Sequence, residues 1–567
     1  MPAYPDQPNA DLLDRVPLTA RIVLDVGCGT GSLGAAYRLL NPRALLLGIE
    51  QDGNAAAIAA HRLDQVAAVD VERDPLPFEL PHGIDCLIYG DVIEHLRDPE
   101  AVLRAQVEAL NPDGTVLICV PNVEHWSFVA RLLRGDWAYE PTGLFDETHL
   151  RWFSLESMRK MLLEAGLALC DVHPRIFDAE QARGFVGVME HALRAMGIDP
   201  QSYVNRAMPL QYVWRARKRE VPRLVIAGTM LEPVGGVSHV RVVYPLQAMA
   251  TDASVQTQLL ALNKLPDLER DMPKVLVLHR PVLNGKQAME MTRWLADRGW
   301  IIVTEFDDHP DFFRALQDPA QLTFRSVHAV QTSTEVLASI LRQRNSEVRV
   351  FPNAVRELPD VVNFADPHRV TVFFGALNRE ADWAPLIGAI NEVAAEMGER
   401  LHFKVVHDQA FFDALTTPHK RFTPTCEHDS YLRLLRRSEI CFMPLSDTPF
   451  NRAKSDLKFI EAAACRVATL ASDVVYGETV QDGRTGLIFR NENELRTLLT
   501  RLVTMPDVAR DIGDAAREYV ARERMLAYQT GPRIAWYRSL WERRAELNEA
   551  VRVRVAGREM MADAAVG

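Results

Sequence analysis

The sequence has few cysteines, no long apolar run and no targeting segment. Its 7 cysteines are widely spaced, and no two form a CxxC pair, which excludes the usual zinc and redox signatures. No apolar stretch approaches the roughly 18 residues of a membrane span, and the N-terminus lacks a basic patch followed by an apolar core. We therefore predict buried thiols in a cytoplasmic protein.

Basic residues are also fewer than acidic ones. Lys and Arg number 64 against 76 Asp and Glu, so the formal net charge is −12. This balance gives no general attraction to phosphate backbones, so we expect no nucleic-acid partner and only local anion sites. With 48% hydrophobic and 25% charged residues, the composition is that of a soluble globular protein.

Short apolar runs alternate with helical patterns along the chain, which is typical of parallel sheets covered on both faces. A length of 567 residues predicts three or four units of about 150 residues each. We predict an α/β protein in which one Rossmann-like domain precedes two Rossmann-like lobes with a cleft between them. The three series of strands begin at residues 21–26, 223–228 and 369–375.

The predicted domains are 1–219, 220–362 and 363–545, followed by a tail at 546–567. The basic run Arg215 to Arg219, ending before Pro222, marks the first boundary. It is interpreted as a solvated linker, although QYVWRARKR also fits the last strand of the first domain.

The C-terminal segment from residue 528 to 556 is basic and helical in pattern, and groups several large apolar side chains: Trp536, Tyr537, Leu540 and Trp541. One interpretation is a helix that docks on a neighbouring lobe. The other is contact with a membrane surface, as in a peripheral protein of the inner membrane.

A glycine-rich turn follows the first strand, in VLDVGCGTGSLG at 23–34. A turn without Cβ atoms lets the backbone approach a ligand closely, and the helix that follows supplies amide donors. Such a turn alone is a weak signal, because dinucleotide-binding folds use one too. Carboxylates at the ends of the next three strands strengthen it: Glu50, Asp70 and Asp91.

These features resemble the class I S-adenosylmethionine-dependent methyltransferases that act on small molecules, over residues 21 to about 175. The matching segments are LDVGCGTG, GIE, VDVERDPLPF, DCLIYGDVIEHLRDP, LNPDGTVLICVPN and DETHLRWFSLESM. The resemblance implies that Glu50 holds the ribose, that Asp70 contacts the adenine amino group and that Asp91 lies beside the methionine amine. Asp91 also fits a helix N-cap before VIEHL. The residues that would line the methionine and ribose region are Asp25, Gly27, Gly29 and Gly31.

Methyl transfer to a sugar hydroxyl needs a general base, and His is the most suitable side chain. The candidates are His95 in VIEHL and His149 in DETHLRWF, although each also fits a structural histidine. We favour His149, because it follows two acidic residues in a loop expected over the cofactor pocket. Glu94 is a candidate acceptor or metal contact, although we expect no metal.

The remaining 350 or so residues resemble the two-lobed retaining glycosyltransferases of the B fold, the family 4 group. The matching segments are MLEPVGGVSH, QTSTEV, FPNAV, FFGALNREADW and chiefly KSDLKFIEAAACRVATLASDVVYGETVQDGRTGLIF. The chain contains no D-x-D triplet, which disfavours the metal-dependent A fold. The resemblance implies a nucleotide-sugar donor whose departing diphosphate is stabilised by basic side chains and a helix N-terminus.

Arg379 follows the GAL turn, and Lys454 and Lys458 fall on one face of a helix that is predicted to run through KSDLKFIEAAA. The resemblance assigns these three residues to the diphosphate. The two lysines also fit a solvated helix face.

The resemblance further assigns Glu461 to the ribose of the nucleotide, and Gly235 and Gly236 to a loop that meets the phosphates. Glu461 also fits an ion-pair partner, and the two glycines also fit a simple turn.

The sequence departs from the family pattern at Ala453, where family members often carry a glutamate that holds the sugar. Sugar recognition then falls to neighbours such as Asn451 and Lys454, or this half is inactive. Asp307 and Asp308 fit either an acceptor contact or strand-end capping.

We predict a bifunctional enzyme of surface polysaccharide biosynthesis that methylates and glycosylates a glycan or a lipid-linked saccharide. Two sites on one chain share substrate most simply when one product is the next acceptor. One alternative is a methyltransferase with a non-catalytic, glycan-binding B-fold module. The other is a non-enzymatic scaffold of a polysaccharide assembly complex.

Overall fold

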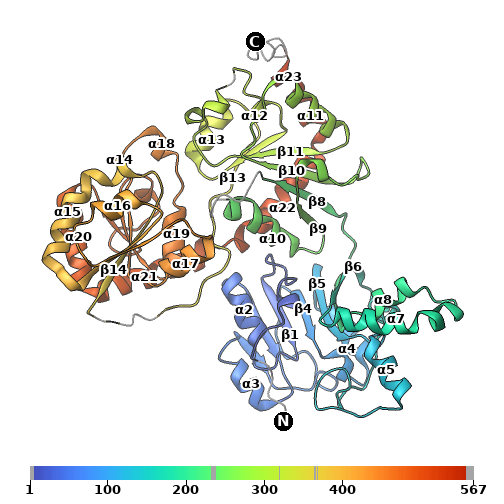
Figure 1. The fold of residues 1–567 in the computed structure, drawn as a ribbon. Coiled ribbons are helices and arrows are strands. Elements are labelled where there is room, and N and C mark those ends of the chain that lie inside the picture. The colour runs from blue at the N-terminus through green and yellow to red at the C-terminus, as the bar shows by residue number, and fades with distance from the viewer. Residues whose placement is uncertain (1–5, 231–237, 318, 363–365, 367, 557–567) are drawn as a thin grey trace. The chain divides into compact units, whose positions relative to one another are not determined.

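The computed structural model describes residues 6–230, 238–317, 319–362, 366 and 368–556. The chain divides into two compact units (Figure 1). Unit 1 holds residues 1–222 together with 250–255, and unit 2 holds residues 223–249 together with 256–567.

Unit 1 is built on a seven-stranded sheet of order β3-β2-β1-β4-β5-β7-β6. The first five strands pair in parallel, whereas β7 pairs antiparallel with both β5 and β6. The strands are β1 (Ile22–Val26), β2 (Leu45–Ile49), β3 (Gln65–Ala67), β4 (Ile84–Gly90), β5 (Leu110–Pro121), β6 (Ala168–Arg175) and β7 (Gln211–Arg217). The predicted parallel sheet is confirmed for β1 to β5, and the two further strands predicted after them are present as the antiparallel β6 and β7.

Helices of unit 1 begin where side chains accept the free amides of the first turn. The Asp52 carboxylate accepts hydrogen bonds from the amides of Asn54 and Ala55 at the start of α3. In Figure 1, α2 and α3 lie beside the β3 end of the sheet, and α5, α7 and α8 beside the β6 end. The helices are α1 (Ala10–Leu13), α2 (Ser32–Leu40), α3 (Gly53–Ala59), α4 (Pro99–Glu108), α5 (Trp126–Arg134), α6 (Leu155–Glu164), α7 (Ala179–Ala195) and α8 (Pro200–Ala207).

The basic run at the end of unit 1 is not a solvated linker. Arg215 and Arg217 lie in β7 and are buried, with 8% and 7% of their surface exposed. Arg215 pairs with Asp171 at 2.6 Å, and Arg217 pairs with Asp252 at 3.2 Å. Because each arginine has an acidic partner, a charged run can be buried in a strand. The local sequence does not reveal these partners.

Unit 2 contains two six-stranded sheets, and every strand pair with a defined register is parallel. The first has the order β13-β12-β11-β10-β8-β9, with β8 (Leu224–Thr229), β9 (Val255–Leu259), β10 (Lys274–His279), β11 (Ile301–Glu305), β12 (Ala329–Thr332) and β13 (Val348–Val350). The second has the order β16-β15-β14-β17-β18-β19, with β14 (Val370–Gly375), β15 (Leu401–Val406), β16 (Lys420–Thr423), β17 (Ile440–Met443), β18 (Ala468–Ser472) and β19 (Leu487–Phe489). The predicted α/β class with three Rossmann-like sheets is confirmed.

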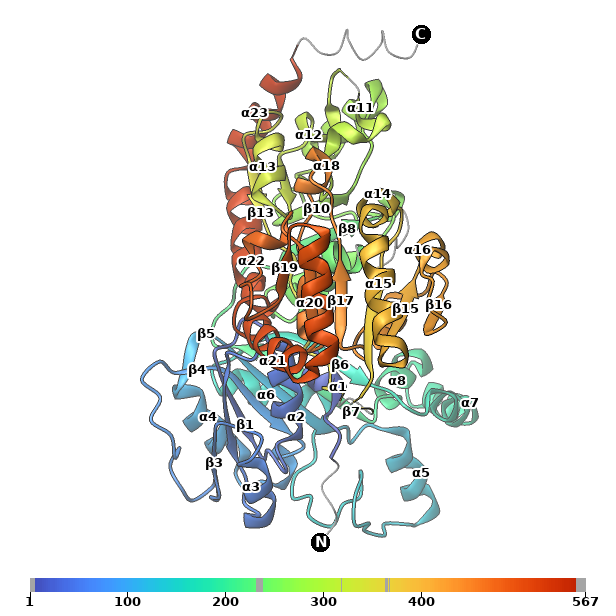
Figure 2. The same ribbon diagram turned by 90° about the vertical axis from the view of Figure 1, so that its left-hand side faces the viewer.

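Helices cover the sheets of unit 2, and α15 and α20 lie side by side over the second one (Figure 2). In the first lobe and its neighbourhood they are α10 (Tyr244–Ala250), α11 (Gly285–Asp297), α12 (Leu322–Arg325) and α13 (Glu335–Arg342). Around the second sheet they are α14 (Glu380–Trp383), α15 (Ile387–Met397), α16 (Gln409–Ala414), α17 (His428–Leu435), α18 (Pro449–Arg452), α19 (Leu457–Ala464), α20 (Glu492–Thr504) and α21 (Pro506–Glu523). The chain continues through α22 (Ala527–Glu542) and α23 (Arg544–Val555).

The aromatic residues near the C-terminus pack inside unit 2. Trp536, Tyr537, Leu540 and Trp541 are all buried. The Tyr537 hydroxyl donates to Gln331 at 2.7 Å. The prediction that these aromatic side chains contact a membrane is therefore wrong, and the docked-helix interpretation fits. Among the residues that the structure describes, none of the helices combines the length and the apolar character that a bilayer span requires.

Candidate functional sites

The glycine turn of unit 1 connects β1 to α2 in a backbone shape that favours glycine. Gly27, Gly29 and Gly31 have φ angles of 71°, 53° and 77°, in the left-handed region. A Cβ on Gly27 would lie 2.3 Å from Cγ2 of Val92, in the loop after β4. The turn thus lies against the carboxyl end of the neighbouring strand, where open α/β sheets bind ligands.

Glu50, directly after β2, is tied to this turn. Its Oε2 accepts the backbone N–H of Gly29 at 2.9 Å, and its Oε1 accepts the N–H of Asp52 at 2.9 Å. The residue is buried, with 5% of its surface exposed. The glycine turn allows a ligand to approach the backbone closely, and the Glu50 carboxylate lies at the end of the second strand. This arrangement is suited to a nucleoside cofactor, as the resemblance implies.

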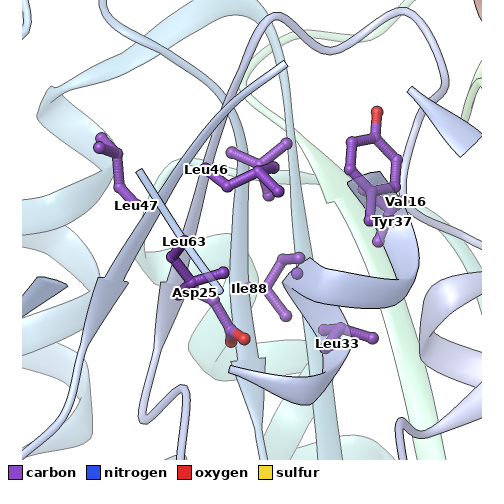
Figure 3. A pocket seen from close by; sticks show the side chains of 10 residues that line it. Val16, Asp25, Leu33, Tyr37, Leu46, Leu47, Leu63 and Ile88 are labelled. Atoms are coloured by element: carbon purple, nitrogen blue, oxygen red, sulfur yellow. The ribbon is translucent and has the colours of Figure 1, made fainter. Parts of the chain in front are cut away.

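Asp25, in β1, faces a small cavity between the sheet and α2 (Figure 3). Aliphatic side chains such as Leu33, Leu46 and Ile88 form most of its lining. Burial, and to a smaller extent the charge of Glu50, raises the pKa of Asp25 to about 7.

The other two predicted cofactor carboxylates lie in loops. The carboxylate of Asp70 accepts the N–H of Glu72 at 3.0 Å and pairs with Arg73 at 3.3 Å. Asp91 is exposed, with a φ of 57°, and accepts a hydrogen bond from the Gln211 amide. The short helix that follows, Ile93–His95, has Val92 at its N-cap and no side-chain cap, so the N-cap interpretation of Asp91 is wrong.

The structure brings His95 and His149 together, although 53 residues separate them. Their ring centroids are 4.8 Å apart. The Leu150 and Arg151 amides donate to the backbone oxygen of Glu94 at 2.8 and 3.0 Å, which fixes one loop against the other. Burial and the neighbouring His95 lower the pKa of His149, which favours the neutral form of its ring.

Glu94 is the most deeply buried member of this group, with 1% of its surface exposed. Burial, followed by the charge of Asp91, raises the pKa of Glu94 well above its ordinary value.

An aromatic cluster lies next to His149: Phe128, Trp137, Phe145 and Trp152, whose ring centroids are 4.6 to 6.1 Å apart. The ring of His149 lies 5.7 Å from that of Trp152. Trp137 remains 41% exposed, so its ring is open to contact with a ligand.

In unit 2, Lys454 and Lys458 do not share a helix face, so that prediction is wrong. Helix α19 begins at Leu457, and Lys454 precedes it. Asp456 forms two hydrogen bonds with Arg524, at 2.6 and 2.8 Å, which hold the chain outside a helical path. The Lys454 ammonium pairs with Asp308 instead.

Lys458 and Glu461 lie one turn apart on α19. The Lys458 ammonium donates to the backbone oxygen of Gly375, and burial lowers its pKa. Burial raises the pKa of Glu461 to about 7, and the charge of Lys458 opposes this shift. Glu461 also lies 3.5 Å from Nε2 of His428.

Arg379 is engaged in a polar network at the start of α14. Its guanidinium donates to Asp382 at 3.0 Å and to Asn451 at 2.8 Å. The Asn451 amide in turn donates to Asp382 at 2.8 Å. Both contacts of Arg379 use its Nη1 group, and Asn451 is buried within the network.

The remaining predicted residues of this half divide into three cases. Gly235 and Gly236 lie outside the described residues. Asp307 pairs with Arg280 at 2.7 Å, and Asp308 lies 3.4 Å from the same guanidinium. Ala453 is 1% exposed and packs into the core of the β8–β13 lobe, so the position of the missing glutamate is closed by apolar contacts.

Several polar partners were missed by the sequence reasoning. Thr148 and Asp146 form a chain of hydrogen bonds to His95, and Gln211 contacts Asp91 from a strand 120 residues away. The acidic residues of DETH gave a weak local signal for the first pair. No local pattern pointed to Gln211.

Comparisons with known proteins match the two halves separately. Residues 4–172 match the model of a methyltransferase domain, and residues 388–531 match a model described as glycosyl transferase-like. The ubiquinone biosynthesis O-methyltransferase of Pseudomonas putida is 30% identical over 139 residues, which are 24% of this chain and 59% of that protein. The same enzyme of Chromobacterium violaceum is 26% identical over 164 residues, 28% of this chain and 70% of that protein. The chain thus spans about 59% of the length of the first curated relatives that it matches.

Two solved structures resemble this chain at low identity. The crystal structure of Anabaena HepE in complex with UDP and glucose is 14% identical, with a TM-score of 0.42 over 56% of this chain and all of that one. The pneumococcal O-GlcNAc transferase GtfA in complex with UDP and GlcNAc is 11% identical, with a TM-score of 0.35 over 48% of this chain and 57% of that one.

Unit 1 therefore carries a methyltransferase domain. In unit 2, residues 388–531 match the glycosyl transferase-like model, and the two parallel Rossmann-like sheets are the architecture expected of the B fold. The chain thus joins a methyltransferase domain to a glycosyltransferase-like domain.

Proposed function

We propose that this chain is a bifunctional enzyme. Unit 1 transfers a methyl group from S-adenosylmethionine to a sugar hydroxyl, and unit 2 transfers a sugar from a nucleoside diphosphate to an acceptor with retention. Both reactions serve a surface polysaccharide, with a glycan or a lipid-linked saccharide as acceptor. One observation carries the proposal: a glycine turn bonded to Glu50 lies against the loop after β4, where His149 packs against His95.

The methyltransferase half uses its own residues to bind and to orient. S-adenosylmethionine, when bound, supplies a methyl group on a sulfonium sulfur. Glu50 and the turn at Gly29 hold the nucleoside, and proximity supplies much of the rate acceleration. The neutral ring of His149 accepts the proton of the acceptor hydroxyl. The aromatic cluster beside it packs on the apolar face of a sugar ring.

The glycosyltransferase half must stabilise the charge that develops on the leaving diphosphate. Lys458, which is half-buried one turn from Glu461, is the best-placed cation. Lys454 serves the same end once a phosphate replaces Asp308 as its partner. We assign Glu461 to the ribose of the donor nucleotide.

Two assays on the full chain test the two activities. Transfer of labelled methyl groups to an oligosaccharide panel tests unit 1, and hydrolysis of nucleotide sugars tests unit 2. We expect His149→Gln to leave cofactor affinity nearly intact and to abolish methyl transfer. His191→Gln, at an exposed position of α7, is the matched control and is expected to keep full activity. Unchanged methyl transfer by His149→Gln would remove this residue as the base.

A second candidate function is a methyltransferase whose unit 2 binds a glycan without catalysis. It is favoured by the closed position of Ala453 and by the engagement of Arg379 with Asp382. It predicts glycan binding by unit 2 with no hydrolysis of any nucleotide sugar. A scaffold, by contrast, predicts binding of neither S-adenosylmethionine nor a nucleotide sugar.

A further inference from the structure

Three side chains of unit 1 converge like the ligands of a metal ion. Glu94, His95 and His149 each offer one ligand atom, and these atoms lie within 4.8 Å of one another. Two of the residues come from the short helix after β4, and the third comes from the loop that follows α5. Such a cluster becomes a candidate site only when something in it lacks a partner.

The Glu94 carboxylate is that group. It is 1% exposed, and neither of its oxygens has a hydrogen-bond partner in the described part of the chain. Burial of a carboxylate without a partner is costly, whether as an ion or as an acid. A cation at the centre of the cluster supplies the missing partner for both oxygens.

The two imidazoles are oriented as metal ligands are. Nδ1 of His95 lies 3.0 Å from the Thr148 hydroxyl, which donates to Asp146 at 2.6 Å. This leaves Nε2 of His95 for a ligand, and metal-binding histidines are commonly fixed by such a second contact. Nδ1 of His149 is buried and has no hydrogen-bond partner in the described part of the chain.

We infer that Glu94, His95 and His149 bind a divalent first-row transition-metal cation. Two imidazoles and one carboxylate suit zinc, iron, cobalt or manganese better than magnesium, which prefers oxygen ligands. Three protein ligands leave coordination positions open, as catalytic metal sites do. The inference replaces the expectation that no metal is needed.

The site stands beside the proposed cofactor pocket. Val92, two residues before Glu94, lies against the Gly27 turn. The inference rests on the proposed methyl transfer for its chemistry: an open position of the cation accepts the hydroxyl oxygen of the saccharide. With His149 holding the cation, the role of base that we propose for it passes to water: the cation lowers the pKa of the bound hydroxyl, and its proton leaves to water. The oxygen then forms a bond to the methyl carbon, the carbon–sulfur bond breaks, and its electron pair stays on sulfur.

Cation binding is measured on the full chain, first stripped with a chelator and dialysed. Titration with Co²⁺, followed by its visible absorption, and with Mn²⁺, followed by the loss of the free-ion EPR signal, reports occupancy without cofactor. We expect one cation per chain. Glu94→Gln and His149→Asn should each weaken binding on the order of 100-fold or more, and Thr148→Val by about 10- to 100-fold. His191→Asn is the control and should bind like the parent protein.

Absence of binding in the parent protein would overturn the inference, and so would equal binding by Glu94→Gln and His149→Asn. Far-ultraviolet circular dichroism shows whether each variant is folded. If Glu94→Gln does not fold, His149→Asn still tests the cation site. A chain that binds the cation but transfers no methyl group refutes the proposed function alone. A chain that transfers methyl groups equally well with and without chelator, and binds no cation, refutes the metal site alone.

Discussion

The backbone N–H of Gly29 donates a hydrogen bond to the Glu50 carboxylate at 2.9 Å, so the residue assigned to the cofactor ribose also holds the turn that receives the cofactor. Hydrogen bonds to charged groups contribute about 1.5–3 kcal/mol. We expect Glu50→Ala to weaken S-adenosylmethionine binding by roughly 10- to 150-fold, as measured by isothermal titration calorimetry. Glu50→Gln keeps an oxygen for Gly29 and should lose less. Equal, undiminished affinity in both variants would contradict the assignment.

Gly27→Ala should damage the same pocket through sterics. Its φ of 71° costs a residue with a Cβ about 1–2 kcal/mol, and the new methyl group would lie 2.3 Å from Val92. We expect a lower melting temperature and at least about tenfold weaker cofactor binding. The double variant Gly27→Ala with Val92→Ala removes the clash but keeps the backbone strain, so it should recover in part. Gly53→Ala, which meets nothing within 4 Å, should have no effect on cofactor binding.

Asp25 predicts a pH dependence of stability. Its pKa rises from 3.8 to about 7 on folding, so folding favours its protonated form. Protonated Asp25 therefore stabilises the fold relative to its ionised form. This stabilisation is fully present below about pH 4 and is lost as the pH rises through about 7. Asp25→Asn removes the cost of ionisation, so its melting temperature relative to the parent protein should increase between about pH 5 and about pH 8. The exposed Asp14→Asn is the control, and a difference that does not grow with pH would refute the prediction.

Glu461 predicts a pH dependence of donor binding. Its pKa of about 7 means that it is largely protonated at acidic pH, and only the ionised carboxylate accepts two ribose hydroxyls well. UDP affinity should therefore rise with pH up to about 7, by at most about tenfold per pH unit. UDP affinity is measured by calorimetry against pH in the parent protein and in Glu461→Gln. Protonation of UDP affects both proteins equally, so the difference between the two pH profiles reports on Glu461. Parallel profiles would remove Glu461 from the nucleotide site.

The sheets were predictable because most of their strands are apolar on both faces. Runs such as 22–26 and 84–90 carry this signal locally, and the structure places β1 and β4 there. The glycine turn was predictable for a similar reason, because left-handed backbone strongly favours glycine.

Contacts between distant residues account for what the sequence did not reveal. The start of α19 at Leu457 depends on the bond between Asp456 and Arg524, which are 68 residues apart. The burial of Arg215 in β7 comes with its pairing to Asp171, and Trp541 is buried in α22. A charged or aromatic run has the same local pattern whether it is solvated or covered.

The central claim is that one chain holds two independent nucleotide pockets. Calorimetric titration of the full chain with S-adenosylmethionine, and then with UDP on the saturated protein, tests it most directly. We predict one equivalent of each ligand with no competition, the first bound more weakly in Glu50→Ala and the second bound more weakly in Lys458→Met. Competition between the ligands, or loss of both sites in either variant, would contradict the account.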